Sequence, residues 1–431
     1  MAGKKEPAAK KASPKKAEAK VSAEDAKALA YLQTLSKKGL LGDLDKNVTF
    51  ISTGSSYIDR SIGNGDGIGS VGGIPRGLLT EIFGQPGSGK TTLALMAAVE
   101  AQKAGGRVIW LDYERSLKAQ VKYVKNLGID VDPSKFILIQ PDNYEDGFTE
   151  LAKAMVALKP DLVVIDSLAA AIPKAAAEGE LGDGIQVGLH AKITSQVLAK
   201  LVKVIEKMNV ALIVLNQTRK VIKASKYDQG PDEQTTGGEA IKFYPHLRIE
   251  IKTKAKEKVE AESSVTGATE DKVINQKAKI VTFKNKIDIP FVSVDVYLTF
   301  GKGFDNIRTT IDTAINRGFL VKEGSWIGYK GLTEETNFRR QGINQTYKYL
   351  SENPTTFAEL EQRCLSAGFG VDRAEMFLAA ERGLLDEDTA KEVAEAGMTE
   401  EDRKALEEMK ELFGDDIGSG DMLTFEQEEL S

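Results

Sequence analysis

Residues 84–91 read GQPGSGKT and fit the pattern G-x-x-x-x-G-K-[ST] of a phosphate-binding loop. An apolar run at residues 78–83 leads into this loop, and a helix-forming run at residues 91–104 follows it. Glycines let successive backbone N–H groups face one centre, and the helix adds its positive N-terminal end. This strand–loop–helix context predicts a nucleotide site formed by Gly84, Gln85, Pro86, Gly87, Ser88, Gly89, Lys90, Thr91 and Thr92.

One side chain of the loop and one from a later strand form a candidate magnesium site. In loops of this kind the lysine, here Lys90, reaches the β- and γ-phosphates, and the hydroxyl, here of Thr91, holds Mg²⁺. Asp166 ends the apolar run DLVVID at residues 161–166, where an aspartate can hold the same ion through water. The structural alternative for Asp166 is a carboxylate that caps the turn after its strand.

Two further polar residues follow apolar runs and are candidates for ATP hydrolysis. Glu114 comes shortly after RVIWLD at residues 107–112 and is a candidate base for the attacking water, with a surface salt bridge as the alternative. Asp112, inside the strand end, is a weaker candidate. Gln217 follows VALIVLN at residues 210–216, where its amide can bond a γ-phosphate and report its presence.

The spacing of the apolar segments predicts an α/β fold. Strand patterns lie at residues 107–112, 136–140, 161–167 and 210–216. Helical patterns alternate with them, at residues 117–127, 144–158 and 194–208. This alternation indicates a mostly parallel central sheet covered by helices. Three later strands are expected to extend the sheet in antiparallel fashion, with a charged mobile hairpin or loop at 253–271; they lie at residues 247–252, 279–284 and 292–300.

Charge divides the chain into parts. The 431 residues carry a net charge of −6, but residues 1–20 carry +5 and residues 371–431 carry −14. Composition and helix signals predict the following order. A disordered basic tail (1–21) precedes an N-terminal helix (22–48), an ATPase core (49–304), a small α+β C-terminal domain (305–370) and an acidic extension (371–431) that is helical to residue 413 and flexible beyond.

Composition also indicates a compartment. Cys364 is the single cysteine, so an internal disulfide is excluded, which suits a reducing compartment such as the cytoplasm. No apolar run approaches the length of a membrane span, and the N-terminus lacks the apolar core of a secretory signal. We therefore expect a cytoplasmic protein without a membrane partner.

Two polar loops are candidates for binding nucleic acid. Residues 218–236 form a long polar loop that includes Arg219 and Lys220, and residues 178–188 contain four glycines and precede Lys192. Long loops in compact domains are usually functional or disordered, and basic side chains suit a phosphate backbone. Taken alone, each loop leaves a DNA contact and an ordinary surface loop as equal alternatives.

Several blocks of this sequence resemble, in order and spacing, those of bacterial RecA recombinases. The resemblance spans about residues 50–355 and rests on ISTGS (51–55), GQPGSGKTTL (84–93), AEGELGD (177–183), NQTR (216–219), TTGGEAIKFY (235–244) and FKNKIDIPF (283–291). It implies a RecA-type P-loop ATPase that uses ATP and Mg²⁺ and forms helical filaments on single-stranded DNA. Such filaments pair with duplex DNA and exchange strands while DNA stimulates hydrolysis. Single-strand-binding and mediator proteins are further partners that the resemblance suggests.

The resemblance also gives roles to residues. Glu114 falls at the family's catalytic glutamate and Gln217 at its γ-phosphate sensor. Residues 179–188 and 218–236 fall at the two DNA-binding loops, and the helix at 22–38 resembles one that packs on the next subunit. Phe243 falls at a position that couples ATP to DNA across the subunit interface. Lys284 and Lys286 fall at lysines that reach the neighbouring subunit's ATP. The DNA-contacting set is Lys192, Ser195, Arg219, Lys220, Gly237 and Gly238.

Some positions depart from the family pattern. Lys118 and Val121 stand where an aspartate and a tyrosine usually lie near the adenine, and Phe300 replaces a further tyrosine. Lys192 and Ala199 stand where the family has arginines. These changes leave the nucleobase selectivity open and indicate a divergent member of the family, for which a viral source is one alternative.

Two other classes of function share part of this evidence. A hexameric helicase motor uses the same ATPase core, but it would be expected to carry an arginine finger and a separate partner-binding N-terminal domain. A regulatory DNA-binding protein that binds ATP without hydrolysing it is the other alternative, and the candidate base Glu114 and both magnesium ligands argue against it.

Overall fold

A computed structural model describes residues 23–37, 47–63, 72–178, 188–220, 233–235, 240–262, 269–366, 368–381, 385 and 387–413. The chain divides into two units, residues 1–47 and 48–431. In the first unit, helix α1 (Ala23–Lys37) confirms the predicted N-terminal helix. Its side chains Leu29, Tyr31 and Leu32 are exposed, so α1 presents an apolar surface. The predicted basic tail lies outside the described residues.

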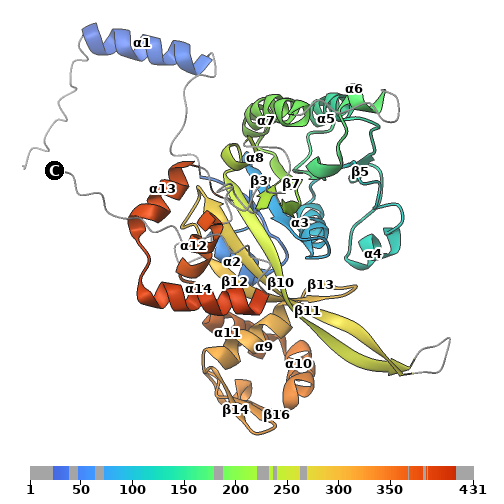
Figure 1. The fold of residues 1–431 in the computed structure, drawn as a ribbon, viewed down its shortest axis with the longest axis vertical. Coiled ribbons are helices and arrows are strands. Elements are labelled where there is room, and N and C mark those ends of the chain that lie inside the picture. The colour runs from blue at the N-terminus through green and yellow to red at the C-terminus, as the bar shows by residue number, and fades with distance from the viewer. Residues whose placement is uncertain are drawn as a thin grey trace, which may run out of the picture. The chain divides into compact units, whose positions relative to one another are not determined.

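The second unit is built on a central sheet that confirms the α/β class (Figure 1). Its nine strands, counted within the described residues, run in the order β13-β12-β11-β10-β3-β7-β6-β4-β5. Neighbouring strands from β10 to β5 are parallel, as predicted for the core. The strands are β3 (Leu79–Gly84), β4 (Val108–Asp112), β5 (Phe136–Ile139), β6 (Leu162–Asp166), β7 (Ala211–Leu215), β10 (Leu247–Glu262), β11 (Thr269–Asn285), β12 (Ser293–Thr299) and β13 (Gly303–Phe304).

The hairpin of β10 and β11 corrects two predictions. First, β10 pairs in parallel with β3, so the antiparallel extension of the sheet begins only at β11. Second, the strands continue far beyond residues 252 and 279, and Figure 1 shows them projecting from the sheet as a two-stranded ribbon. A hairpin or loop was predicted for this segment, but its strands were missed because residues 253–271 are charged and lack the apolar alternation of a half-buried strand.

Helices cover both faces of the sheet, which explains its continuous apolar strands. One buried cluster joins the sheet to α3 (Lys90–Lys103), and another joins it to α5 (Tyr144–Leu158) and α7 (Leu189–Met208). Successive residues of β6 alternate between the two, with Val163 in one cluster and Val164 in the other. The helix predicted at 117–127 is shorter, as α4 (Val121–Asn126), and the one predicted at 194–208 begins earlier.

Shorter elements connect these layers. β1 (Phe50–Ile51) pairs with β2 (Ile74–Pro75), and α2 (Ser56–Ile62) lies between them in sequence. A 3-10 turn, η1 (Leu168–Ala170), and α6 (Lys174–Ala177) follow β6. Strands β8 (Thr218–Lys220) and β9 (Glu233–Thr235) and helix α8 (Ala240–Phe243) follow β7.

The C-terminal part confirms the predicted mixture of helices and strands after residue 305. A three-stranded antiparallel sheet is flanked by helices, and three more helices follow it. The elements are α9 (Asn306–Asn316), β14 (Leu320–Glu323), β15 (Trp326–Tyr329), η2 (Glu334–Thr336), β16 (Phe338–Gln341), α10 (Gly342–Glu352), α11 (Pro354–Ser366), α12 (Arg373–Glu381), α13 (Glu387–Ala396) and α14 (Glu400–Phe413). Residues 414–431 lie outside the described residues, and the exact domain limits stay predictions.

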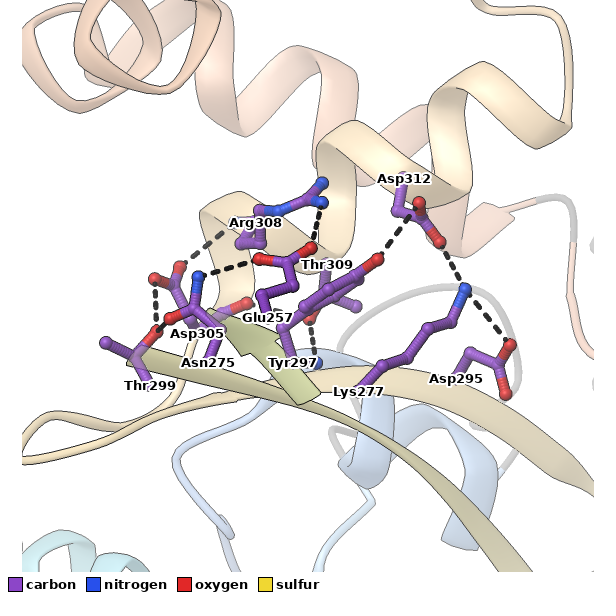
Figure 2. Close-up of polar contacts among 10 residues, drawn as sticks. All are labelled: Glu257, Asn275, Lys277, Asp295, Tyr297, Thr299, Asp305, Arg308, Thr309 and Asp312. Carbon is purple, nitrogen blue, oxygen red and sulfur yellow. Dashed lines mark hydrogen bonds and ion pairs between the residues drawn. The ribbon is translucent and has the colours of Figure 1, made fainter. Parts of the chain in front are cut away.

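A polar network fixes α9 to the sheet (Figure 2). Arg308 of α9 pairs with Glu257 of β10 at 2.8 Å, and its guanidinium lies 4.1 Å from the ring centre of Tyr297 in β12. Asp312, one turn further along α9, accepts a 2.8 Å hydrogen bond from Lys277 of β11. The remaining members of the network are Asn275, Asp295, Thr299, Asp305 and Thr309. The first helix of the predicted C-terminal domain is therefore anchored on the ATPase core.

Among the helices that the structure describes, none is both long and apolar enough to cross a membrane.

Candidate nucleotide and DNA site

The phosphate loop lies where β3 ends and α3 begins. Gly84 is the last residue of β3, with φ 148°, and a Cβ there would lie 2.4 Å from the carbonyl oxygen of Ile251. Gly89, the cap of α3, has φ 107°, and its Cβ would lie 3.0 Å from the side chain of Leu298. Both positions require glycine because a side chain would push β10 and β12 away from the loop.

The lysine of the loop is buried inside it. Lys90 Nζ donates hydrogen bonds to the carbonyl oxygens of Gly84 at 3.0 Å and Gln85 at 2.9 Å. Burial lowers the pKa of this ammonium, while the negative charges of Glu114 and Asp166 act in the opposite direction. The curled loop therefore surrounds a cation that lies close to two carboxylates.

The carboxylates of Asp112, Glu114 and Asp166 meet at the same edge of the sheet, because β4 and β6 are parallel neighbours. Asp112 and Asp166 are paired in register at the carboxyl ends of these strands. The hydroxyl of Thr91 lies 3.4 Å from Asp166 Oδ2. Burial raises the pKa of Asp166 to about 7, and the charges of Glu114 and Asp112 add to the effect. A cation at this position would favour the ionised carboxylate.

The structure brings Glu114 and Gln217 together, as their predicted roles require. Gln217 Nε2 donates to Glu114 Oε1 at 3.3 Å, and Ser167 Oγ donates to the same oxygen at 2.7 Å. Ser167 was missed in the sequence. Its position in the sequence could have indicated it. Ser167 directly follows Asp166 at the end of β6 and so lies at the edge of the sheet where the other candidates lie.

Asp112 has a structural role, which agrees with its ranking as the weaker candidate base. Its carboxylate accepts a 2.9 Å hydrogen bond from Gln140 and two longer ones from the backbone N–H groups of Ser116 and Leu117. The side chain is fully buried, so it stabilises the turn after β4. Glu114, in contrast, is exposed at the end of this turn.

A buried ion pair supports the segment that carries Gln217. Asn216 donates to Glu81 at 2.8 Å, and the other oxygen of Glu81 accepts from Arg248 at 2.6 Å. Asn216 Oδ1 in turn accepts from the backbone N–H of Gln217. These contacts fix the backbone from which the Gln217 amide reaches Glu114.

Lys284, Lys286 and Phe243 lie at the opposite end of the strands from the phosphate loop. Asn285 pairs with Leu247, and Leu247 pairs with Thr80 at the start of β3. From Thr80 to Gly84 the strand advances about 13 Å, at roughly 3.3 Å per residue. Lys284 Nζ donates to the carbonyl oxygens of Lys242 at 2.9 Å and Phe243 at 3.3 Å, whereas Lys286 is exposed.

The described part of the DNA-contacting set lies on two elements. Lys192 is exposed and Ser195 is half-buried in the first turns of α7. Arg219 and Lys220 lie in β8, which pairs with β9 to form an antiparallel ribbon directly after Gln217. The two ends of the predicted loop at 218–236 are therefore held together by strand pairing. Gly237 and Gly238, and most of the two loops, lie outside the described residues.

The residues near the expected nucleobase are open to solvent. Val121 is 48% exposed and Phe300 50% exposed, and Lys118 is also exposed. The hydroxyl of Tyr123, two residues after Val121, shares a 2.6 Å hydrogen bond with the hydroxyl of Thr92. Gln276 of β11, which was not singled out in the sequence, contacts the carbonyl oxygen of Ser88 at 3.4 Å.

Comparisons with known proteins identify the family of this chain. The family model "RecA N-terminal domain" matches residues 32–305. "Protein RecA" of Thermotoga sp. (strain RQ2) is 38% identical over 342 residues, which cover 78% of this chain and 89% of the relative. "Protein RecA" of Ruminococcus albus is 34% identical over 402 residues, 91% of this chain and 92% of the relative. That of Streptomyces coelicolor is 35% identical over 340 residues, 78% of this chain and 83% of the relative. The chain therefore belongs to the bacterial RecA family.

Proposed function

We propose that the protein is an ATP-dependent DNA recombinase that forms filaments on single-stranded DNA and exchanges strands with duplex DNA. The observation that carries this proposal is the meeting of Glu114 and Gln217 beside the phosphate loop. The residue after Gln217 begins the β8–β9 ribbon. One short segment thus connects the site of hydrolysis to a loop suited to DNA.

The loop residues 84–92 bind ATP in this proposal, and Lys90 would reach its β- and γ-phosphates. Thr91 and Asp166 fit a magnesium ion, because a hydroxyl and one carboxylate are the protein ligands that such an ion takes beside phosphates and water. When bound, Mg²⁺ would neutralise charge that develops on the phosphate oxygens. In the described part of the chain, no group of three or more His, Cys, Asp or Glu side chains is placed to hold a metal by itself.

Gln217 couples the nucleotide to DNA. Its amide donates a hydrogen bond to Glu114. A γ-phosphate offers several charged oxygens that compete with the Glu114 carboxylate as acceptors for the same amide. Movement of Gln217 toward them would free Glu114 to orient the attacking water and would shift the adjoining ribbon, whose loop holds the DNA.

Lys284 and Lys286 act on the ATP of a neighbouring subunit. Their position about 13 Å along the sheet from the phosphate loop of their own subunit supports a role in trans. Phe243, which is 45% exposed and contacts Lys284 through its carbonyl group, belongs to the same surface. Helix α1, with its exposed apolar side chains, packs on the next subunit in this proposal.

We expect Ser167→Ala to lower kcat for ATP hydrolysis about tenfold, with KM for ATP almost unchanged. The Ser167 hydroxyl orients the proposed base Glu114 and has no part in the proposed binding of the nucleotide. Steady-state hydrolysis on single-stranded DNA measures both constants. Ser351→Ala, an exposed serine on α10, is the control. Wild-type kcat in Ser167→Ala would show that the hydroxyl does not orient Glu114.

Deleting residues 414–431 is expected to strengthen duplex DNA binding about tenfold at low salt, with a smaller difference as salt rises. This segment contains six acidic residues and no basic ones, so it can compete with DNA for the basic loops. Titration of duplex DNA at several salt concentrations is the measurement. A full-length variant with the six acids changed to amides should behave like the deletion, and unchanged affinity in both would exclude this brake.

The proposed function is tested by measuring ATP hydrolysis with and without single-stranded DNA and imaging the same samples by electron microscopy. DNA-stimulated turnover with helical filaments is the expected result. Closed rings would instead favour the helicase alternative. Turnover that does not respond to DNA would break the proposed connection from Gln217 to the ribbon.

Three further assignments stay predictions. These are the cytoplasmic location, the binding of single-strand-binding or mediator proteins, and the division into domains at residues 48, 304 and 370.

A further inference from the structure

The helices after the small C-terminal domain pack on the ATPase core. We call residues 371–413 the C-terminal extension. Several of its buried side chains form a cluster with aromatic residues of β3, β11 and the loop before β12, namely Phe83, Phe283 and Phe291. The extension contributes Met376, Phe377, Ala379, Leu385 and Val393 to this cluster. The proposed function assigns no role to these helices, although they cover a face of the sheet.

The first residues of the extension are bonded to the strands beneath it. Val371 forms a β-bridge with Val292, and the backbone N–H of Asp372 donates to the carbonyl oxygen of Phe291 at 2.8 Å. The Asp372 carboxylate accepts from Ser293 at 2.7 Å and pairs with Lys279 at 2.8 Å. The extension thus begins with a fixed attachment to the start of β12 and to β11.

Phe291 has a backbone conformation that needs external support. Its φ is +60°, in the left-handed region that bulky side chains rarely adopt. Such a residue persists only where its surroundings hold it. Its ring is 4% exposed and lies edge-on to Phe283, with ring centres 6.2 Å apart. The extension supplies part of this packing and donates to the carbonyl group of Phe291.

Phe283 and Phe291 flank the segment that carries the two proposed trans lysines. Lys284 directly follows Phe283, and Lys286 lies in the loop that ends at Phe291. The middle of this loop is fixed by Asn285, which donates to the carbonyl oxygen of Ile62 at 2.7 Å and accepts from the N–H of Ile287. The backbone N–H of Lys286 also donates to the carbonyl oxygen of His246 at 2.9 Å. The two aromatic ends add further support, and both lie in the cluster that the extension completes.

We propose that the C-terminal extension is a positioning element for Lys284 and Lys286, and that it acts through the cluster around Phe283 and Phe291. This inference rests on the proposed role of these lysines in trans. The extension touches no nucleotide in this arrangement. It keeps the loop in one conformation, so that the lysines are preorganised to reach the ATP of a neighbouring subunit.

The test uses two buried residues of α12 that face different surroundings. Phe377 belongs to the cluster with Phe291, whereas Leu378 packs inside the extension, with Ala374, Met398 and Ala405. We expect Phe377→Ala in the full chain to lower kcat for DNA-stimulated hydrolysis about tenfold, since small losses of positioning cost up to about 10² in rate. Leu378→Ala should stay within about twofold of wild type, and Phe377→Leu should recover most of the rate.

A double-variant comparison separates positioning from general stability. If the extension acts through the lysines, Phe377→Ala should cause no further loss when Lys284 and Lys286 are both alanine. Hydrogen exchange of residues 285–291 should also become faster in Phe377→Ala but not in Leu378→Ala. This second readout does not depend on filament formation.

The outcomes distinguish the inference from the function on which it rests. An unchanged rate in Phe377→Ala, or an equal loss with and without the lysines, overturns the positioning role while leaving the recombinase intact. Wild-type turnover in the double lysine variant overturns both the role of the lysines and the inference.

Discussion

Glu114→Gln is expected to lower kcat for ATP hydrolysis about 10²- to 10⁴-fold while ATP and DNA binding are retained. Glutamine keeps the size of the side chain and an oxygen that can accept from Ser167, so the site should not collapse. What it loses is the charge that can accept a proton from the attacking water. Because Lys90 and the loop glycines are untouched, the binding of ATP should remain.

Single-turnover hydrolysis on single-stranded DNA, with separate measurement of nucleotide affinity, tests this expectation. Glu150→Gln on α5 is a matched control, since Glu150 is exposed and forms a 2.7 Å surface ion pair with Lys153. Turnover close to wild type in Glu114→Gln would show that another group is the base. Asp112 would then be an unsuitable replacement, because it is buried and bonded to Gln140.

Changing Lys284 and Lys286 together to alanine is expected to lower filament hydrolysis about 10³-fold, the lower end of what an arginine finger contributes. Nucleotide binding by dispersed subunits should be unaffected, because these lysines lie far along the sheet from the phosphate loop of their own subunit. Replacing both lysines with arginine keeps the charges and should retain part of the rate.

Mixed filaments give a direct test of action in trans. Subunits with Glu114→Gln retain both lysines, and subunits with the double lysine change retain Glu114. Each population alone should be inactive, but where they adjoin, the lysines of one can complete the site of the other. Mixing should therefore restore hydrolysis well above either population. No restoration would mean that the lysines do not act across the interface.

The sequence by itself determined the core of the fold and placed the candidate site residues on it. The loop at residues 84–91, the apolar strands and their spacing predicted a parallel sheet with the functional residues at one edge. This worked because parallel strands have a common direction, so residues that end successive strands meet without knowledge of their packing. Glu114, Asp166 and Gln217 were placed at one edge in this way, and their roles stay predictions.

Only the tertiary structure decided which groups support that site. Ser167, Gln276 and the Glu81–Arg248 pair carry no local motif, and their roles follow from contacts between segments far apart in sequence. The parallel pairing of β10 with β3 was also hidden, because a strand pattern specifies neither its partner nor its direction.

In the C-terminal extension, too, the sequence determined some features and only the tertiary structure decided others. Its acidic composition and helical periodicity could be recognised in the sequence, and its helices were predicted. The surface that it contacts could not be predicted. An apolar face on a helix indicates that the face is buried, but it does not identify the segment that covers it. Local propensity and periodicity are properties of the chain, whereas the packing of Phe377 with Phe291 is a property of the folded molecule.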